Sequence, residues 1–330
     1  MKKYNIAIVG ATGLVGKKIL EVLKERNFPM GNLIPMASER SAGELIEYAG
    51  KKYQVVKVSE EAFEQKIDMA FFAAGGEISE KFAPIASKRG IQVIDNSSVF
   101  RMDKDVPLIV PEVNPEDINK SKGIIANPNC STIQCMLPIK AIQEIYGVKR
   151  IVYSTYQSVS GSGTKGLRDL DEGLSEFYPR PIKGNVIPHI DVFLDDGYTK
   201  EEQKMMDETR KILHDENLKV TATAVRVPVR FAHSISATIE LEKDFKIRDI
   251  KEILNKFPGI ILKDDPENAV YPIPEDAEGK DDVFVGRVRR DFSVDNGLHL
   301  WIVADNIRKG AATNSVQIGE LLVKSWEKNI

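Results

Sequence analysis

The sequence predicts an α/β protein of two domains, in which an N-terminal doubly wound sheet is followed by an α/β domain with a mostly antiparallel sheet. The first 130 residues alternate short apolar runs with amphipathic stretches, a pattern typical of parallel βαβ units. Longer runs rich in β-branched residues follow, and they favour antiparallel strands. The length of 330 residues suits two domains of ~100–200 residues each.

The strands of the first domain are predicted from seven apolar runs. These runs lie at residues 6–10, 33–38, 53–58, 69–74, 92–97, 108–113 and 123–128. Helical patterns at 13–27 and 79–90 separate some of them, with apolar residues recurring on one face. We place this domain at residues 1–129.

The second domain, at residues 130–309, is predicted from its longer strands. They lie at 150–160, 220–229, 233–242 and 298–306, and the last follows an Asn-Gly pair typical of a hairpin turn. Helices are expected at 131–146 (with a kink at Pro138), 198–213 and 244–256. The region 162–190 is expected to be an ordered insertion, and a final helix at 310–330 is expected to pack back on the first domain.

Composition excludes several classes of protein. The formal net charge of −3 argues against a nucleic-acid surface or a basic membrane patch. No apolar run approaches the ~18–20 residues of a membrane-spanning helix, and the N-terminal apolar run is too short for a signal peptide. Two cysteines give no disulfide framework. A cytoplasmic protein is therefore expected.

A glycine-rich turn follows the first strand. Gly10, Gly13 and Gly16 form GxxGxxG, where backbone N–H groups at a helix start favour a pyrophosphate. We expect a Rossmann-type nucleotide site here, although such a turn can also serve chain geometry alone. The second strand ends at Arg40, flanked by Ser38 and Ser41, and a guanidinium with nearby hydroxyls suits the 2′-phosphate of NADP. Glu39 offers the alternative of an NAD ribose contact, with Arg40 solvated.

Cys130 stands between an Asn-Pro-Asn turn and a predicted helix, where a thiolate is favoured. Taken alone it could equally be a small buried residue, and Cys135 is expected to be one. Of the four histidines, His233 opens a strand close to Arg226 and Arg230. A lone strand histidine is more often structural, but a general base near arginines suits a thiol acting on an anion.

The motifs together resemble aspartate-semialdehyde dehydrogenase. They are GATGLVG, SERSAG, DNSSVFRMD, NPNCSTIQ, YQSVSGSG, RVPVRFAHS and IRKGAATNSVQI, in one order over nearly the whole chain. The resemblance implies reduction of L-aspartyl-4-phosphate to L-aspartate 4-semialdehyde with NADPH and release of phosphate, on the route to lysine, methionine and threonine. It implies a homodimer or a tetramer, and no metal.

The resemblance also implies a role for individual residues. Cys130 would be the acyl-thioester nucleophile, His233 the general acid and base, and Gln157 the residue that orients the acyl group. Arg226 would bind the substrate carboxylate and Glu201 its amine, while Arg101 and Lys204 would bind phosphate. The NADP site would be formed by Thr12, Gly13, Leu14, Val15, Arg40, Ser41, Ser160, Gly161 and Asn314.

Several alternatives stay open at this stage. N-acetyl-glutamyl-phosphate could be the substrate of the same thiol and histidine, or the chain could be a sensor that binds NADP without catalysis. By pattern alone, Glu201 and Lys204 would form an ordinary solvated pair on a helix. Arg230 could point toward His233, where it would lower the histidine's pKa, or away from it. If the enzyme reading is right, Cys130 and His233 must come within thiol–imidazole reach.

Overall fold

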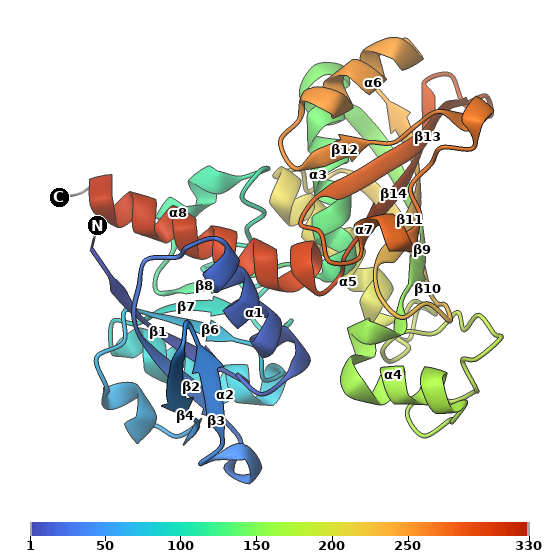
Figure 1. The fold of residues 1–330 in the computed structure, drawn as a ribbon. Coiled ribbons are helices and arrows are strands. Elements are labelled where there is room, and N and C mark those ends of the chain that lie inside the picture. The colour runs from blue at the N-terminus through green and yellow to red at the C-terminus, as the bar shows by residue number, and fades with distance from the viewer. Residues whose placement is uncertain (1, 329–330) are drawn as a thin grey trace. The chain divides into compact units, whose positions relative to one another are not determined.

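The chain divides into two compact units in a computed structural model that describes residues 2–328 (Figure 1). The first unit contains the chain up to Pro128 together with the segment from Ala311 onward, and the second contains Asn129–Gly310. Within the described residues there are two six-stranded sheets and a separate two-stranded hairpin. Each unit builds its own sheet and its own hydrophobic core.

The first unit holds a parallel sheet with the order β5-β2-β1-β6-β7-β8. Its strands are β1 (Tyr4–Val9), β2 (Met30–Ala37), β5 (Val56–Lys57), β6 (Met69–Phe72), β7 (Gln92–Asp95) and β8 (Ile124–Ala126). All neighbouring strands that are paired in this sheet run parallel. The order reverses on either side of β1, which is the topological switch point of a Rossmann fold.

Successive residues of β1 point to opposite faces of this sheet, and both faces are buried. Ile6 and Ile8 lie in one core with α1 (Leu14–Glu25) and α8 (Asn314–Lys328), whereas Ala7 and Val9 lie in another with α2 (Gly76–Lys88). Helix α1 forms because its buried residues recur every three or four positions. Each large apolar side chain buried in this way contributes roughly 1.5–3 kcal/mol.

Two predicted strands of the first unit differ in the structure. Residues 108–113 form a turn with a single bridge from Leu108 to Ala126, so that prediction was wrong. The side chain of Asn114 explains this, because it accepts from the Val110 N–H and donates to the Leu108 carbonyl, both at 2.9 Å. Residues 53–58 are divided between β5 and β4 (Lys51–Gln54), which pairs with β3 (Leu45–Tyr48) as the separate hairpin.

The second unit holds a mixed sheet with the order β10-β9-β11-β14-β13-β12. Its strands are β9 (Val148–Gln157), β10 (Lys219–Arg226), β11 (His233–Leu241), β12 (Ile260–Leu262), β13 (Val283–Asp291) and β14 (Gly297–Ala304). The three central pairs, β9–β11, β11–β14 and β14–β13, are antiparallel, and the two outer pairs are parallel. The predicted fold class is confirmed, with β12 and β13 as additions.

Helix α3 (Cys130–Tyr146) is the central helix of the second unit. It contacts β9, β11, β13 and β14, and on another side α5 (Lys200–Leu213) and α6 (Ile247–Lys256) (Figure 1). Its residues are buried nearly all round, because it is enclosed by the sheet and these helices. The helix continues through Pro138 and ends at Gly147, whose φ is 67°.

The remaining elements are short. The expected insertion at 162–190 contains α4 (Gly163–Glu172), and α7 (Pro274–Ala277) follows a loop. Short 3₁₀ turns lie at Glu39–Ser41, Glu61–Glu64, Pro115–Lys120, Val159–Ser162 and Pro266–Asn268, and a π-helical turn at Arg308–Thr313 precedes α8. Among residues 2–328, no helix is both long enough and apolar enough to cross a membrane.

Candidate active site

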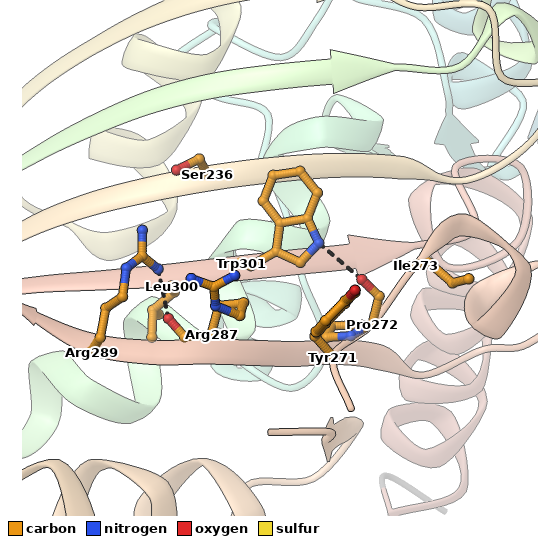
Figure 2. Close-up of a pocket in the computed structure, with 8 residues that line it drawn as sticks. All are labelled: Ser236, Tyr271, Pro272, Ile273, Arg287, Arg289, Leu300 and Trp301. Atoms are coloured by element: carbon orange, nitrogen blue, oxygen red, sulfur yellow. Dashed lines mark hydrogen bonds between the residues drawn. The ribbon is translucent and has the colours of Figure 1, made fainter. Parts of the chain in front are cut away.

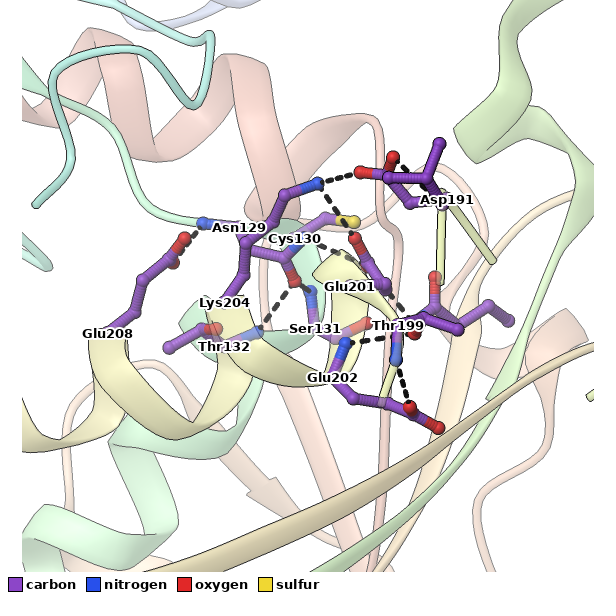
Figure 3. Close-up of polar contacts among 12 residues, drawn as sticks. Asn129, Cys130, Ser131, Thr132, Asp191, Thr199, Glu201, Glu202, Lys204 and Glu208 are labelled. Atoms are coloured by element: carbon purple, nitrogen blue, oxygen red, sulfur yellow. Dashed lines mark hydrogen bonds and ion pairs between the residues drawn. The ribbon is translucent and has the colours of Figure 1, made fainter. Parts of the chain in front are cut away.

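Cys130 is the first residue of α3, and the residue before it caps that helix. The Asn129 side-chain oxygen accepts from the backbone N–H groups of Ser131 at 2.9 Å and Thr132 at 3.3 Å (Figure 3). The cap is typical of asparagine, whose oxygen replaces a carbonyl that the helix start lacks. Because the N-terminal end of a helix carries partial positive charge, it favours a thiolate at Cys130.

His233 lies beside this thiol although 103 residues separate the two in the chain, and Cys130 Sγ is 3.3 Å from His233 Nε2. The sequence-based expectation that they meet is confirmed. Gln134 of α3 fixes the two elements together, because its side chain donates to the His233 carbonyl at 3.1 Å. Burial, and then the charge of Arg226, lower the pKa of His233 well below its ordinary value.

Cys135 lies one turn further along α3 and is fully buried. Burial raises the pKa of this thiol well above its ordinary value, so it is a core residue, as predicted.

Two neighbouring strands bring Gln157 and Arg226 to the same edge of the sheet. They are direct partners in the parallel pairing of β9 and β10, and both lie at the carboxyl ends of their strands. Arg226 Nη1 donates to the Ser158 carbonyl at 2.6 Å, and its buried Nε has no hydrogen-bond partner among residues 2–328. Such a buried donor is suited to a ligand oxygen.

Glu201 and Lys204 share one face of α5, and Glu201 is only 6% exposed. One Glu201 oxygen accepts from Asn129 at 2.9 Å, and the other lies 3.3 Å from Lys204 (Figure 3). The first oxygen also accepts from Gln157 at 3.2 Å. Lys204 also pairs with Asp191 at 2.6 Å. Glu201 and Lys204 do form a pair, but not the solvated one that the spacing alone favoured, because Glu201 is buried against Asn129 and Gln157.

The pKa of Glu201 reflects opposing influences. Burial alone would raise it, but the charge of Lys204, the hydrogen bond from Asn129, the charge of Arg226 and the bond from Gln157 together lower the pKa below its usual range. Glu201 is therefore a carboxylate at neutral pH. A buried carboxylate can bind an ammonium group.

Two glycines lie so close to the residues of this site that a side chain at either position would contact them. A Cβ on Gly161 would lie 3.1 Å from Arg226 Nη1 and 3.4 Å from His233 Cε1. A Cβ on Gly310 would lie 2.8 Å from Cys130 Cβ. Gly310 therefore needs the smallest residue for steric reasons, and a side chain at Gly161 would fit only tightly against Arg226 and His233.

The first unit carries the predicted nucleotide turn. Gly10 has φ 92°, and a Cβ there would lie 2.5 Å from the Ala73 carbonyl oxygen, while one on Gly16 would lie 2.1 Å from the Gly10 oxygen. Gly13 precedes the first turn of α1 without a side-chain cap, so backbone N–H groups at Leu14 and Val15 are offered to a ligand. A pyrophosphate fits this turn, and Thr12 lies in it half-buried.

The other predicted cofactor and phosphate residues of this unit lie around the carboxyl ends of its strands. Arg40 is exposed and Ser41 buried in the 3₁₀ turn after β2, and Glu39 pairs with Lys57 at 2.9 Å. Arg101 donates to the carbonyls of Asn96 and Asn127, both at 2.9 Å. Asn314 is buried at the start of α8 and donates to Asn127 Oδ1 at 2.7 Å.

The chain is similar over nearly its whole length to known proteins. A family model for the NAD binding domain of semialdehyde dehydrogenases matches residues 5–121, and one for their dimerisation domain matches residues 139–309. The aspartate-semialdehyde dehydrogenase of Aquifex aeolicus is 54% identical, over 97% of this chain and 98% of its own. The chain belongs to the aspartate-semialdehyde dehydrogenase family. The resemblance drawn from its motifs is thereby confirmed.

Solved structures of this family have the same fold. Aspartate semialdehyde dehydrogenase II of Vibrio cholerae, complexed with ASA, superposes with a TM-score of 0.94 at 46% identity, covering 98% of this chain and 99% of that one. The Candida albicans enzyme with NADP gives a TM-score of 0.78 at 25% identity, covering 97% and 98%. This member of the family is therefore an oxidoreductase of amino-acid biosynthesis with a nicotinamide-dinucleotide-binding domain.

The structure also decides the direction of Arg230 in this aspartate-semialdehyde dehydrogenase family member. Arg230 is half-exposed and pairs with Asp171. Its charge is not among the causes that lower the pKa of His233. Arg230 therefore points away from the thiol–imidazole pair.

Four polar residues of the site were missed from the sequence. They are Asn129, Ser158, Asp191 and Asn306. Only Asn129 carries a usable signal, since an asparagine just before a helix is a typical cap. The other three act through contacts between segments distant in the chain, which no local pattern reports.

Proposed function

We propose that this chain reduces L-aspartyl-4-phosphate to L-aspartate 4-semialdehyde with NADPH and releases phosphate, a step toward lysine, methionine and threonine. The observation that carries the proposal is the Cys130–His233 pair, 3.3 Å apart at the capped start of α3. Arg226 acts on the pKa of His233, and Glu201 links the Asn129 cap to Lys204. This set of charges suits a substrate with a carboxylate, an ammonium group and a phosphate. The Vibrio cholerae relative, complexed with ASA, supports the same substrate class.

The chemistry needs one nucleophile and several fixed charges. Cys130 thiolate attacks the acyl carbon, the bond from that carbon to the phosphate oxygen breaks, and a thioester and free phosphate result. A nicotinamide dinucleotide, when bound, would supply the hydride for reduction of the thioester carbonyl. Loss of the thiolate from the reduced carbon then gives the aldehyde and restores Cys130. An oxyanion forms at the substrate carbonyl in both stages, and the N-terminal N–H groups of α3 are suited to stabilise it.

The other residues are assigned by their chemistry. His233 is the acid–base group, and Gln157 orients the acyl group. Arg226, with its unpartnered Nε, would bind the α-carboxylate through a bidentate fork, and Glu201 would bind the α-ammonium group. Arg101 and Lys204 would hold the phosphate.

We assign NADP rather than NAD to this chain. Glu39 forms an ion pair with Lys57, so the charged group of the 3₁₀ turn that can bind a 2′-phosphate is Arg40. The Candida albicans relative with NADP supports this choice. The remaining contacts are assigned to Thr12, Gly13, Leu14, Val15, Ser41, Ser160, Gly161 and Asn314.

Arg40→Ala is expected to weaken NADP binding by about 10–100-fold, a loss of roughly 1.5–3 kcal/mol for a charge-assisted bond, and to leave NAD binding unchanged. Isothermal titration with both dinucleotides checks this, and equal loss for both would contradict the assignment.

A homodimer is proposed to form through the face of the second sheet that α3 does not cover. On this face Tyr156 is 41% exposed, with its ring 5.5 Å from that of Trp301. Beside them a cavity of about 380 Å³ is lined by Tyr271, Arg287, Trp301 and their neighbours (Figure 2). The match to a dimerisation domain over 139–309 supports a second copy as the occupant.

The deciding experiment is NADPH formation from aspartate semialdehyde, with and without phosphate. Formation that requires both NADP and phosphate supports acyl-phosphate chemistry, and Cys130→Ala should abolish it while NADP binding is kept. NADPH formation without phosphate would overturn the acyl-phosphate step. Absence of turnover with aspartate semialdehyde, but turnover with the N-acetyl-glutamyl analogue, would overturn the substrate assignment.

A further inference from the structure

The insertion at 162–190 contacts Arg226 of β10 through its main chain and through an aromatic ring. The Arg226 N–H donates to the Ile187 carbonyl at 2.8 Å, and the Ile187 N–H donates to the Arg226 carbonyl at 2.9 Å. The guanidinium carbon of Arg226 lies over the ring of Tyr178, 5.9 Å from its centroid. Both contact residues are buried in one small hydrophobic cluster, formed by Val159, Tyr178, Ile182 and Ile187. The insertion therefore holds both the backbone and the side chain of Arg226.

These contacts leave one edge of the guanidinium for a ligand. Nη1 donates to the Ser158 carbonyl at 2.6 Å, whereas the buried Nε has no hydrogen-bond partner among residues 2–328. Nε lies on the same edge of the planar group as Nη2, and two parallel donors on one edge suit a carboxylate. The Tyr178 ring supports the cation without blocking this edge. An aromatic face attracts a guanidinium, and unlike an acidic side chain it does not compete with a ligand carboxylate.

Tyr178 is itself fixed by a buried carboxylate. Asp169 of α4 is fully buried, and its Oδ2 accepts from the N–H groups of Phe177 at 2.9 Å and of Tyr178 at 3.0 Å. Its Oδ1 accepts from the Glu176 N–H at 3.2 Å. The Tyr178 hydroxyl donates to Ser162 Oγ at 2.9 Å. Because bonds to a carboxylate are stronger than those to a neutral acceptor, Asp169 fixes the segment that carries the ring.

We infer that Tyr178, held by Asp169, is a positioning residue that keeps the Nε edge of Arg226 turned toward the substrate and so selects an aldehyde with an α-carboxylate. This inference deepens the proposed function, on which it rests for the role of Arg226. It gives the insertion a part in substrate specificity, because the ring and the carboxylate that holds it both belong to that segment.

The test compares two aldehydes that differ only in the carboxylate. Aspartate semialdehyde carries it, and 3-aminopropanal has a hydrogen atom in its place. Protection of Cys130 from iodoacetamide reports the binding of each without phosphate, dinucleotide or turnover. Cys135 is fully buried, and Cys130→Ala gives the background. Tyr178→Leu is expected to weaken protection by aspartate semialdehyde by about tenfold, within the range of a desolvated cation–π contact, and to leave protection by 3-aminopropanal unchanged.

Two further variants separate the ring from its surroundings. Tyr178→Phe keeps the ring and loses only the bond to Ser162, so it should protect as the wild type does. Phe177→Leu is the matched control, because it removes the neighbouring half-exposed ring of the same loop and should affect neither aldehyde. Loss of discrimination in Phe177→Leu equal to that in Tyr178→Leu would count against the specific role of Tyr178.

Asp169→Asn tests the support of the ring. It should weaken protection by aspartate semialdehyde alone, as Tyr178→Leu does. Combined with Tyr178→Leu it should cause no further loss of discrimination, because both changes act through one ring. A further loss in the double variant would show that Asp169 acts by another route and would overturn its place in the inference.

The outcomes distinguish this inference from the proposed function. Equal loss for both aldehydes in Tyr178→Leu would mean that the ring only supports the fold, and no loss for either would mean that Arg226 is oriented without it. Both results overturn the inference alone, and if Tyr178→Leu does not fold, Asp169→Asn decides by the same comparison. A wild type that aspartate semialdehyde protects no better than 3-aminopropanal would refute the role of Arg226, and the inference with it.

Discussion

Glu201 shows at the scale of one residue how the site balances burial against charge. A carboxylate taken out of water is destabilised unless hydrogen bonds and cations compensate for the lost hydration. Glu201 receives that compensation from Asn129, Gln157 and Lys204. Its charge therefore contributes to folding as well as to the proposed binding of an ammonium group.

Glu201→Gln is expected to destabilise the protein by about 2 kcal/mol at neutral pH, within the range for hydrogen bonds to charged groups. The folded-state pKa of Glu201 is lowered, so its stabilisation is fully present above the unfolded value of about 4.3 and is lost as pH falls through the lower folded value. Urea midpoints at several pH values should show the gap from wild type closing in acid. Glu216→Gln, on an exposed residue, is the control and should show no such gap. A gap for Glu201→Gln that does not change with pH would contradict this account.

Gly310 is a second residue whose effect can be measured. Gly310→Ala places a Cβ 2.8 Å from Cys130 Cβ and 3.2 Å from Cys130 Cα, so the thiol must move. A misplaced nucleophile should slow turnover by about 10²-fold. Gly31→Ala, whose Cβ would meet only side chains and one carbonyl at 3.1 Å or more, serves as the control and should leave turnover at the wild-type value. Wild-type turnover in Gly310→Ala would show that the backbone yields without cost.

At the scale of elements, the two helices of the site begin with different caps. Asn129 caps α3 and also donates to Glu201, so its side chain links the thiol helix to the charged face of α5. Thr199 caps α5 through a capping box with Glu202. Both caps satisfy N–H groups that a helix start leaves unpaired.

The caps predict different consequences for the thiol. Asn129→Ala and Thr199→Ala should each cost about 1 kcal/mol of stability, the usual value for a lost N-cap. Only Asn129→Ala should also slow alkylation of Cys130, because that cap fixes the first turn of α3. Thermal unfolding together with iodoacetamide kinetics separates the two effects. Equal slowing in both variants would mean that the thiol responds to stability in general.

At the scale of the whole molecule, the face of the second sheet that carries Tyr156 and Trp301 is not covered by α3. Tyr156→Asp places a charge on this face and is expected to cost a dimer about 2–5 kcal/mol, as burying an unpaired charge does. Sedimentation velocity should then show monomers at concentrations where the wild type is dimeric. Leu45→Asp changes an exposed apolar residue of the first unit and should leave the dimer intact. Dimers in both variants would place the interface elsewhere.

Local patterns were sufficient for much of the fold. The spacing of Ile19, Val22 and Leu23 predicts α1, and the turn at Gly10–Gly16 predicts its N-terminal end. The stretch at 108–113 failed, because the Asn114 side chain occupies backbone groups that a strand would use. The pattern of apolar residues cannot predict this failure. It depends on which side chains are apolar, whereas the strand is prevented by side-chain hydrogen bonds to backbone groups.

The sequence by itself determined the α/β class and the family, and it supplied the residues to which the reaction is assigned by proposal, because these depend on residue type and on spacing along the chain. Only the tertiary structure decided the polar surroundings of these groups: Ser158 beside His233, Glu201 buried rather than solvated, and Arg230 turned to Asp171. The physical reason is that burial and hydrogen bonding are set by segments far apart in the chain. The same glutamate–lysine spacing is a weak surface pair in water and a strong charged contact once the sheet and α3 exclude that water.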